Sequence, residues 1–142
     1  MKLTKKVLYN TAKPCDFRWP YQNQQLSEQM LVFMRSENGI GLAAPQIGIA
    51  KRVFVMAIDG TTWTCFNPEI LDTDSNLTDY TEGCLSFPGE ECKIKRPSAV
   101  AVKYQNSHGH WTHEQLDGLV ARCFQHELDH LDGITMQDRA KE

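Results

Sequence analysis

The sequence predicts a single α+β domain over residues 1–142, with one helix near each end and small antiparallel or mixed β-sheets between them. Three observations lead to this prediction. Apolar residues recur at helical spacing in two segments, 24–37 and 117–131, and two stretches between these segments have the pattern of β-hairpins. With 142 residues, of which 41% are hydrophobic, the chain can bury one core but is too short for two ordinary domains.

The first predicted helix spans residues 24–37. Its apolar side chains are three or four residues apart, so they form one stripe of an amphipathic helix. Gly39 follows the helix and can adopt the positive φ that often ends one. The side chains of the stripe are Leu26, Met30, Phe33 and Met34.

The first predicted hairpin joins residues 52–58 to residues 61–66. Both segments are rich in apolar, β-branched and aromatic residues, which favour strands. Between them, Asp59-Gly60 is a strong signal for a two-residue turn, because both positions of such a turn need positive φ. We therefore expect two paired antiparallel strands here.

A second hairpin is predicted further along the chain, where residues 99–104 and 110–116 flank a turn-like segment. The stretch 81–97 lies between the two hairpins and is interrupted by glycine and proline. We expect it to form a loop with a short strand. No internal repeat, low-complexity tract or linker is present.

The last predicted helix starts at Asp117, which is a suitable N-cap, and runs to about Leu131, with Gly133 as its stop. Its spacing places apolar residues at one end of a face and polar, chemically active residues at the other, whereas Arg122 and Asp129 point elsewhere. The residues on this face are Leu119, Cys123, His126, Glu127 and His130.

Composition and charge exclude several classes of protein. The net charge of −3 and the scattered basic residues give no field for binding nucleic acid. The first ten residues lack the apolar run of a signal peptide, and no stretch approaches the 18 apolar residues of a membrane span. The five cysteines form no Cys-x-x-Cys pair and are expected to be reduced. We expect a soluble, cytoplasmic protein without a membrane partner.

The pattern His-Glu-x-x-His occupies residues 126–130. Four residues apart on a helix, His126 and His130 can bind one metal ion with Glu127 beside it, which indicates metal-assisted hydrolysis. The alternative is a helix whose histidines only pack or cap. Zinc proteases with this pattern take a third ligand from downstream, but only nine residues follow Gly133, so the third ligand must lie upstream.

Several upstream residues could supply this third ligand. Three histidines crowd the predicted turn of the second hairpin, where a solvated surface role is the simpler reading. Cys84 lies in a loop, where a thiolate would be a good ligand for zinc or ferrous iron. We therefore choose Cys84; the other candidates are assorted carboxylates and the histidines His108, His110 and His113.

A glycine-rich segment, GIGLAAPQIG at 39–48, has the form of a dinucleotide-binding fingerprint, which raises an oxidoreductase as an alternative. That fingerprint must follow a strand and open a helix, whereas this segment follows a predicted helix and is interrupted by Pro45. The better interpretation is a tight loop that lets a substrate backbone approach, with the Gln46 amide as an oriented donor.

Three segments together resemble the signature motifs of the peptide deformylases, in the same order: GIGLAAPQIG, EGCLSFPG and QHELDHLDG. The resemblance covers roughly residues 26–139. It implies an α+β metallohydrolase whose sheets pack around a central C-terminal metal-binding helix. Such an enzyme removes the formyl group from the N-terminal formylmethionine of nascent polypeptides and releases formate. The resemblance also implies one divalent metal per chain, Fe(II) in the native enzyme, which Zn, Ni or Co can replace.

The resemblance also assigns roles to individual residues. Glu127 matches the general acid/base, and the Gln46 amide and the Leu85 backbone N–H match the donors to the oxyanion. The backbones of Ile40 and Gly41 match positions that pair with the substrate as an added strand. The metal ligands are Cys84, His126 and His130, and the methionine pocket includes Glu82, Leu119 and Cys123. Plain packing is an equal alternative for Leu119 and Cys123.

The chain departs from the family pattern in two respects. Glu91 stands where most bacterial members have an arginine, seven residues after the ligand cysteine, so electrostatic help to the downstream peptide is in doubt. The chain also ends nine residues after Gly133, without the long C-terminal helix that is linked with ribosome docking, and this leaves ribosome contact open. A peptide-binding module that has lost catalysis is a rival hypothesis, but the intact metal ligands and Glu127 weigh against it.

Overall fold

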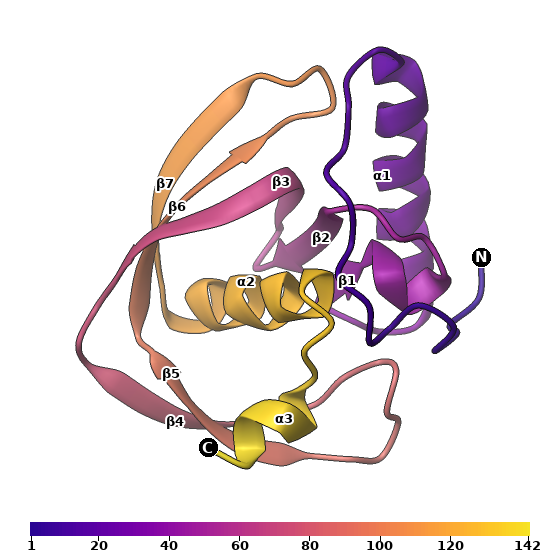
Figure 1. The fold of residues 1–142 in the computed structure, drawn as a ribbon. Coiled ribbons are helices and arrows are strands. Elements are labelled where there is room, and N and C mark those ends of the chain that lie inside the picture. The colour runs from indigo at the N-terminus through magenta and orange to yellow at the C-terminus, as the bar shows by residue number, and fades with distance from the viewer.

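The computed structural model describes residues 1–142 and has the α+β architecture that the sequence predicts (Figure 1). Its elements are α1 (Pro20–Ser36), β1 (Gly41–Ala43), the 3-10 helix η1 (Ala44–Ile47), β2 (Val53–Ile58), β3 (Thr61–Thr73), β4 (Leu77–Glu82), β5 (Cys92–Pro97), β6 (Ala99–Gln105), β7 (Trp111–Asp117), α2 (Gly118–Leu131) and α3 (Met136–Ala140). No helix is both long enough and apolar enough to cross a membrane.

Two antiparallel sheets surround α2. The larger has five strands in the order β1-β2-β3-β6-β7, and the smaller pairs β4 with β5. Figure 1 shows α2 in the middle of the molecule, with β3, β6 and β7 curving around one side of it and the β4–β5 pair on another. α1 lies beyond β1 and β2. The helix that carries the His-Glu-x-x-His pattern, α2, is therefore central, as predicted.

β2 lies between the two long helices, because both of its faces are buried. Phe54 and Met56 belong to the core cluster that contains Phe124 of α2, while Val55 belongs to a second cluster with Met30 of α1. Alternate residues of a strand point to opposite faces, so a continuous apolar run suits a strand that is covered on both sides. This packing fixes α2 against the sheet and holds β1 beside it.

α1 begins earlier and ends differently than the sequence predicted. It starts at Pro20, because proline's fixed φ and missing N–H are tolerated in the first turn of a helix. Asn38, at φ 59°, takes the left-handed conformation after the helix, and Gly39 does not. Gly39 is close to another segment instead: a Cβ there would lie 2.7 Å from Leu85 Cδ1.

The first hairpin is confirmed, but its second strand is longer than predicted. Asp59 and Gly60 both have positive φ, at 51° and 79°, as a two-residue turn requires. β3 continues to Thr73 through an irregularity between Phe66 and Glu69, and it then pairs with β6. Pro68 interrupts the pairing because it has no N–H to donate.

The β4–β5 pair was only partly predicted. The sequence predicts a loop with a short strand over 81–97, whereas β4 begins at Leu77 and pairs with β5 up to the Glu82–Cys92 position. Every residue of β4 except Glu82 is exposed, so the strand has no apolar alternation that could reveal it. The loop that follows β4 carries Cys84 toward α2.

Candidate metal centre

α2 brings three polar residues of one motif into the interior of the protein. Asp117 precedes the helix as predicted, although its side chain makes no capping hydrogen bond. His126, Glu127 and His130 are all buried, with His130 only 1% exposed. Because four residues make about one turn, both imidazoles lie on one face, and their ring centroids are 5.0 Å apart.

Cys84 joins the two histidines from the loop after β4. The ligand atoms of Cys84, His126 and His130 all lie within 4.8 Å of one another, and Cys84 Sγ is 3.4 Å from His130 Nε2. One thiolate and two imidazoles suit Fe(II), Zn and similar first-row ions, and three protein ligands leave a coordination position open. The residues present therefore fit a catalytic metal, and the predicted ligand set meets in space.

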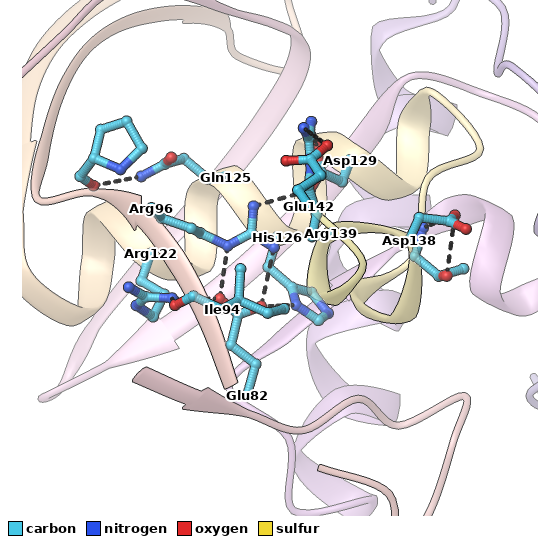
Figure 2. A network of polar contacts seen from close by, with 12 residues as sticks. Glu82, Ile94, Arg96, Arg122, Gln125, His126, Asp129, Asp138, Arg139 and Glu142 are labelled. Atoms are coloured by element: carbon cyan, nitrogen blue, oxygen red, sulfur yellow. Dashed lines mark hydrogen bonds and ion pairs between the residues drawn. The ribbon is translucent and has the colours of Figure 1, made fainter. Parts of the chain in front are cut away.

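Glu82 orients the ring of His126. The Nδ1–H of His126 donates to Glu82 Oε1 at 2.8 Å, which leaves Nε2 free to face the metal position. Arg96 donates to both oxygens of Glu82, from Nε at 2.6 Å and from Nη2 at 3.0 Å, and Arg122 Nη1 donates to Oε2 at 2.6 Å (Figure 2). The Glu82 carboxylate is thus fully occupied by these three side chains.

These contacts set the protonation of the groups around the metal position. Burial opposes ionisation of Glu82, but hydrogen bonds from His126 and Arg96 outweigh it and lower the pKa of Glu82 to about 2. Burial would likewise lower the pKa of His126, but hydrogen bonds to Cys84 and Glu82 raise it to about 10. His130 has no carboxylate partner, and burial lowers its pKa to about 3. A metal binds the neutral form of each imidazole, so its affinity for this site should depend on pH.

Glu127 lies beside the ligands without a partner of its own. Its Oε1 is buried and accepts no hydrogen bond, and burial raises the pKa of Glu127 to about 7. Gly41 of β1 lies directly against it, since a Cβ at that position would be 2.5 Å from Glu127 Oε2. A carboxyl group with a pKa near neutrality and a free oxygen can both accept and donate a proton.

Two hydrogen-bond donors lie next to Cys84. The Gln46 side chain is fixed at its oxygen, which accepts from Ala43 N at 2.9 Å, and its Nε2 lies 3.0 Å from Ser86 Oγ and 3.5 Å from Cys84 Sγ. The backbone N–H of Leu85 donates to no backbone acceptor. Both groups can donate to a ligand that enters the site.

A cavity of about 410 Å³ opens onto these groups and is lined by residues of β1, β4, α2 and the loop that follows β4. Ile40 and Leu119 lie at its exposed rim, and Cys123 and Glu127 lie deeper. All of the sequence-predicted site residues except His130 line this cavity. Glu82 also lines it, although its carboxylate is bound to His126 and two arginines. The remaining histidines, His108, His110 and His113, are exposed at or near the β6–β7 turn and contribute nothing to this site.

Several residues around the centre were missed by sequence reasoning. Ser86 contacts the Gln46 amide, and Arg96 and Asp129 extend the contacts of Glu82 into a buried ionic cluster. A signal was present in the case of Asp129, because it lies inside the His-Glu-x-x-His pattern on a helix that is buried on nearly every side. Arg96 carries no such signal, since its partners come from segments far away in the sequence.

The fold and this ligand set define a metal-dependent hydrolase. The family model described as Polypeptide deformylase matches residues 1–142, and the chain belongs to that family. Its activity is the removal of the formyl group from the N-terminal formylmethionine of polypeptides.

Individual relatives agree with this assignment. The chain is 43% identical over 133 residues to a peptide deformylase of Thermotoga maritima, covering 94% of this chain and 80% of the relative, and 48% identical over 120 residues to one of Natranaerobius thermophilus, covering 84% and 77%. Among solved structures, the T. maritima peptide deformylase superposes with a TM-score of 0.92 at 41% identity, covering 97% of this chain and 95% of that one. A peptide deformylase from Synechococcus elongatus in complex with actinonin gives a TM-score of 0.90 at 40% identity, covering 99% and 76%.

Proposed function

We propose that Glu127 is the general acid/base of the deformylation reaction and that Cys84, His126 and His130 hold the metal. The observation that carries this proposal is the buried, unpartnered carboxylate oxygen of Glu127 beside three converging ligands. When bound there, a divalent metal would polarise the formyl oxygen and lower the pKa of water. Glu127 accepts a proton from the attacking water and then delivers it to the nitrogen of the leaving amine.

The Gln46 amide and the Leu85 N–H donate to the oxygen that becomes negative as the formyl carbon turns tetrahedral. The position of Gln46 supports this role, because its fixed oxygen leaves Nε2 directed toward Cys84. Donors held in place before the reaction stabilise the developing charge more than they stabilise the neutral substrate. Losing one such donor typically lowers the turnover number by about 10²–10³.

The substrate backbone binds along the free edge of β1. Ile40 O already accepts from Ala57 N, and hydrogen bonds alternate in direction along an antiparallel strand, so the N–H and C=O of Gly41 face away from β2. β1 is the end strand of its sheet, which leaves this edge open. Ile40 O retains a second lone pair for the substrate. A short extended peptide would therefore add to the sheet as a further strand.

The methionine side chain occupies the cavity beside this edge, against Leu119, Cys123 and the non-polar part of Glu82. Burying an apolar side chain of this size is worth about 2 kcal/mol. Formyl-Met peptides should therefore be cleaved roughly 30-fold more efficiently than formyl-Gly peptides, as kcat/KM. An equal preference would contradict the pocket.

We propose Fe(II) as the native metal, with Zn, Ni or Co as substitutes. The thiolate in the ligand set supports a metal of this group, but a ferrous ion and its thiolate ligand can both be oxidised. The ferrous enzyme should therefore lose activity in air faster than the nickel enzyme. Equal rates of inactivation with and without oxygen would overturn this assignment.

The central experiment measures formate release from formyl-Met-Ala-Ser and metal content on the same sample. We expect one metal ion per chain and activity in proportion to metal content. A fully loaded protein that binds the peptide without releasing formate would instead be a binding module. We expect the enzyme to act in the cytoplasm, where nascent polypeptides are made, and a ribosome-binding assay would determine whether it acts in contact with the ribosome.

A further inference from the structure

A chain of ionic contacts connects the C-terminal helix α3 to the metal ligand His126 (Figure 2). Arg139 of α3 donates twice to Asp129, from Nε to Oδ2 at 3.0 Å and from Nη2 to Oδ1 at 2.8 Å. Arg96 Nη1 donates to the same Oδ2 at 2.9 Å, and its other nitrogens hold Glu82. Glu82 in turn accepts the Nδ1–H of His126. Each member is therefore fixed by the next.

Arg139 has a specific part in this series of ionic contacts, because it supplies hydrogen bonds to both oxygens of Asp129. Asp129 is 7% exposed, and its Oδ1 accepts a hydrogen bond from Arg139 alone. Without Arg139, the buried carboxylate would keep Arg96 as its only cationic partner, and an incompletely paired buried charge is costly. Arg96 lies between two carboxylates, so it would shift toward Asp129 and loosen its two-pronged contact with Glu82.

α3 has other anchors that hold it in place. Thr135 N–H and Oγ both donate to Asp138 Oδ2, at 3.0 and 3.2 Å, which caps the start of the helix. Met136 is 1% exposed and packs in a small core cluster with Leu8, Phe87 and Ile94. The guanidinium of Arg139 is therefore not required to dock the helix, and its two bonds to Asp129 serve the ionic chain.

We propose that Arg139 is a positioning residue for the metal ligand His126, acting through Asp129, Arg96 and Glu82. The proposal rests on the ligand set stated under the proposed function. Residues that orient a ligand typically contribute 10- to 100-fold to metal affinity. Three side chains lie between Arg139 and His126 in this series of contacts. We therefore expect that replacing Arg139 reduces metal affinity by an amount at the lower end of this range.

The test compares Arg139→Met with two controls in the full chain loaded with Co(II). Glu142→Ala removes the other partner of Arg139, Nη1 to Oε1 at 3.2 Å, but leaves both bonds to Asp129. Asp132→Asn neutralises an ion pair of similar length, 2.9 Å from Arg52 Nη2 to Asp132 just after α2, that does not lead to Glu82, and it leaves Arg52 bound to Leu131 O. For each variant, the measurements are the visible spectrum of Co(II), which reports its ligand geometry, and the rate of metal loss to a chelator.

Arg139→Met should shift the Co(II) absorption bands and speed metal loss by about 10-fold, while both controls match the parent protein. Unchanged bands and metal loss in Arg139→Met would overturn the proposal, as would equal changes in Asp132→Asn. If Arg139→Met does not fold, Arg139→Lys keeps the charge but not the two-pronged contact, and it should show a smaller shift in the same direction.

A Cys84→Ser variant separates this inference from the ligand assignment on which it rests. If Cys84→Ser loses the metal while Arg139→Met leaves the spectrum unchanged, the ligand set stands and only the role of Arg139 fails. If Cys84→Ser keeps the metal with an unaltered spectrum, the ligand set itself is wrong, and the inference about Arg139 falls with it.

Discussion

The unpartnered oxygen of Glu127 distinguishes this residue from the other buried carboxylates of the protein. Glu82 and Asp129 accept hydrogen bonds from arginines on both oxygens, whereas Glu127 Oε1 accepts none. Burial without a partner favours the neutral acid, so the carboxyl group can exchange its proton near neutral pH. The arginine contacts hold the first two carboxylates in place, whereas the free oxygen of Glu127 supports its proposed role as the acid/base.

Glu127→Gln therefore tests the chemistry at a single atom. The amide has nearly the same shape but cannot accept a proton, so we expect the metal to stay bound while the turnover number falls by roughly 10²–10⁴. Metal content and formate release must be measured on the same preparation. Loss of metal would make Glu127 a ligand, and unchanged turnover would assign the proton to another group.

Gly41→Ala should also reduce activity, because the new methyl group would meet Glu127 Oε2 at 2.5 Å and Cys123 Sγ at 2.8 Å. We expect a fall in kcat of at least about tenfold, since small displacements of a catalytic group cost this much or more. Gly83→Ala is the matched control, because its Cβ would come no closer than 4.0 Å to Glu90 O. Equal kcat values for the two variants would show that the space beside Glu127 is not restricted.

Part of the site could be predicted from the sequence and part could not. His126 and His130 meet because a helix brings residues four positions apart onto one face. The loop position of Cys84 and the chemistry of its thiol indicated it as the third ligand, and the structure places it beside both histidines. The roles of Glu127, Gln46, Leu85 and the pocket residues remain predictions. Arg96 and Arg139 were not foreseen, since their contacts depend on how β5 and α3 pack against α2, and no local pattern encodes that packing.

At the scale of whole elements, prediction succeeded where an element buries many apolar residues. Residues 117–131 formed the expected helix because their apolar residues recur at helical spacing, and residues 52–58 formed the expected strand because they are a short, continuous apolar run that ends at a turn. β4 was missed because nearly all of it is exposed and the strand is held by pairing with β5. Glu82 is the one buried residue of β4. Ion pairs hold its side chain in the interior, so the strand has no buried apolar residue that a sequence pattern could reveal.

The stop of α2 depends on the freedom of Gly133, which has φ of 73° and lies against the backbone of Tyr9. Gly133→Ala should destabilise the fold by clearly more than the roughly 1–2 kcal/mol of a left-handed residue, because its Cβ would lie 2.6 Å from Tyr9 O. Gly60 has a similar φ of 79° but open space around it, so Gly60→Ala measures the cost of the left-handed backbone alone. Urea unfolding gives the free energy of unfolding of each variant. Equal losses of this free energy in both variants would contradict the predicted clash at Gly133.

At the scale of the whole molecule, the metal connects parts of the chain that are far apart in the sequence. Cys84 follows the small sheet, while His126 and His130 belong to the central helix. The three ligands come together only in the folded protein, so metal binding stabilises that state and adds a cross-link between two layers.

Removing the metal with a chelator should therefore lower the Tm. At a free metal concentration 100 times the Kd, the lost stabilisation is about 2.7 kcal/mol, which corresponds to several degrees for a domain of this size. Cys84→Ser should have the low Tm without any chelator. Cys15→Ser alters a thiol that is not a ligand, so its Tm should still respond to chelation. A chelator that leaves the parent Tm unchanged would contradict this link.

The open edge of β1 also bears on the solubility of the protein. An unpaired strand at the end of a sheet is a template on which other chains can assemble into aggregates. Here the edge is three residues long and lines a cavity together with residues of β4 and α2. A strand this short offers few unpaired N–H and C=O groups to another copy, and very short edge strands are one way in which proteins limit such pairing. The shortness of β1 therefore disfavours assembly into aggregates and still leaves an edge for a short peptide.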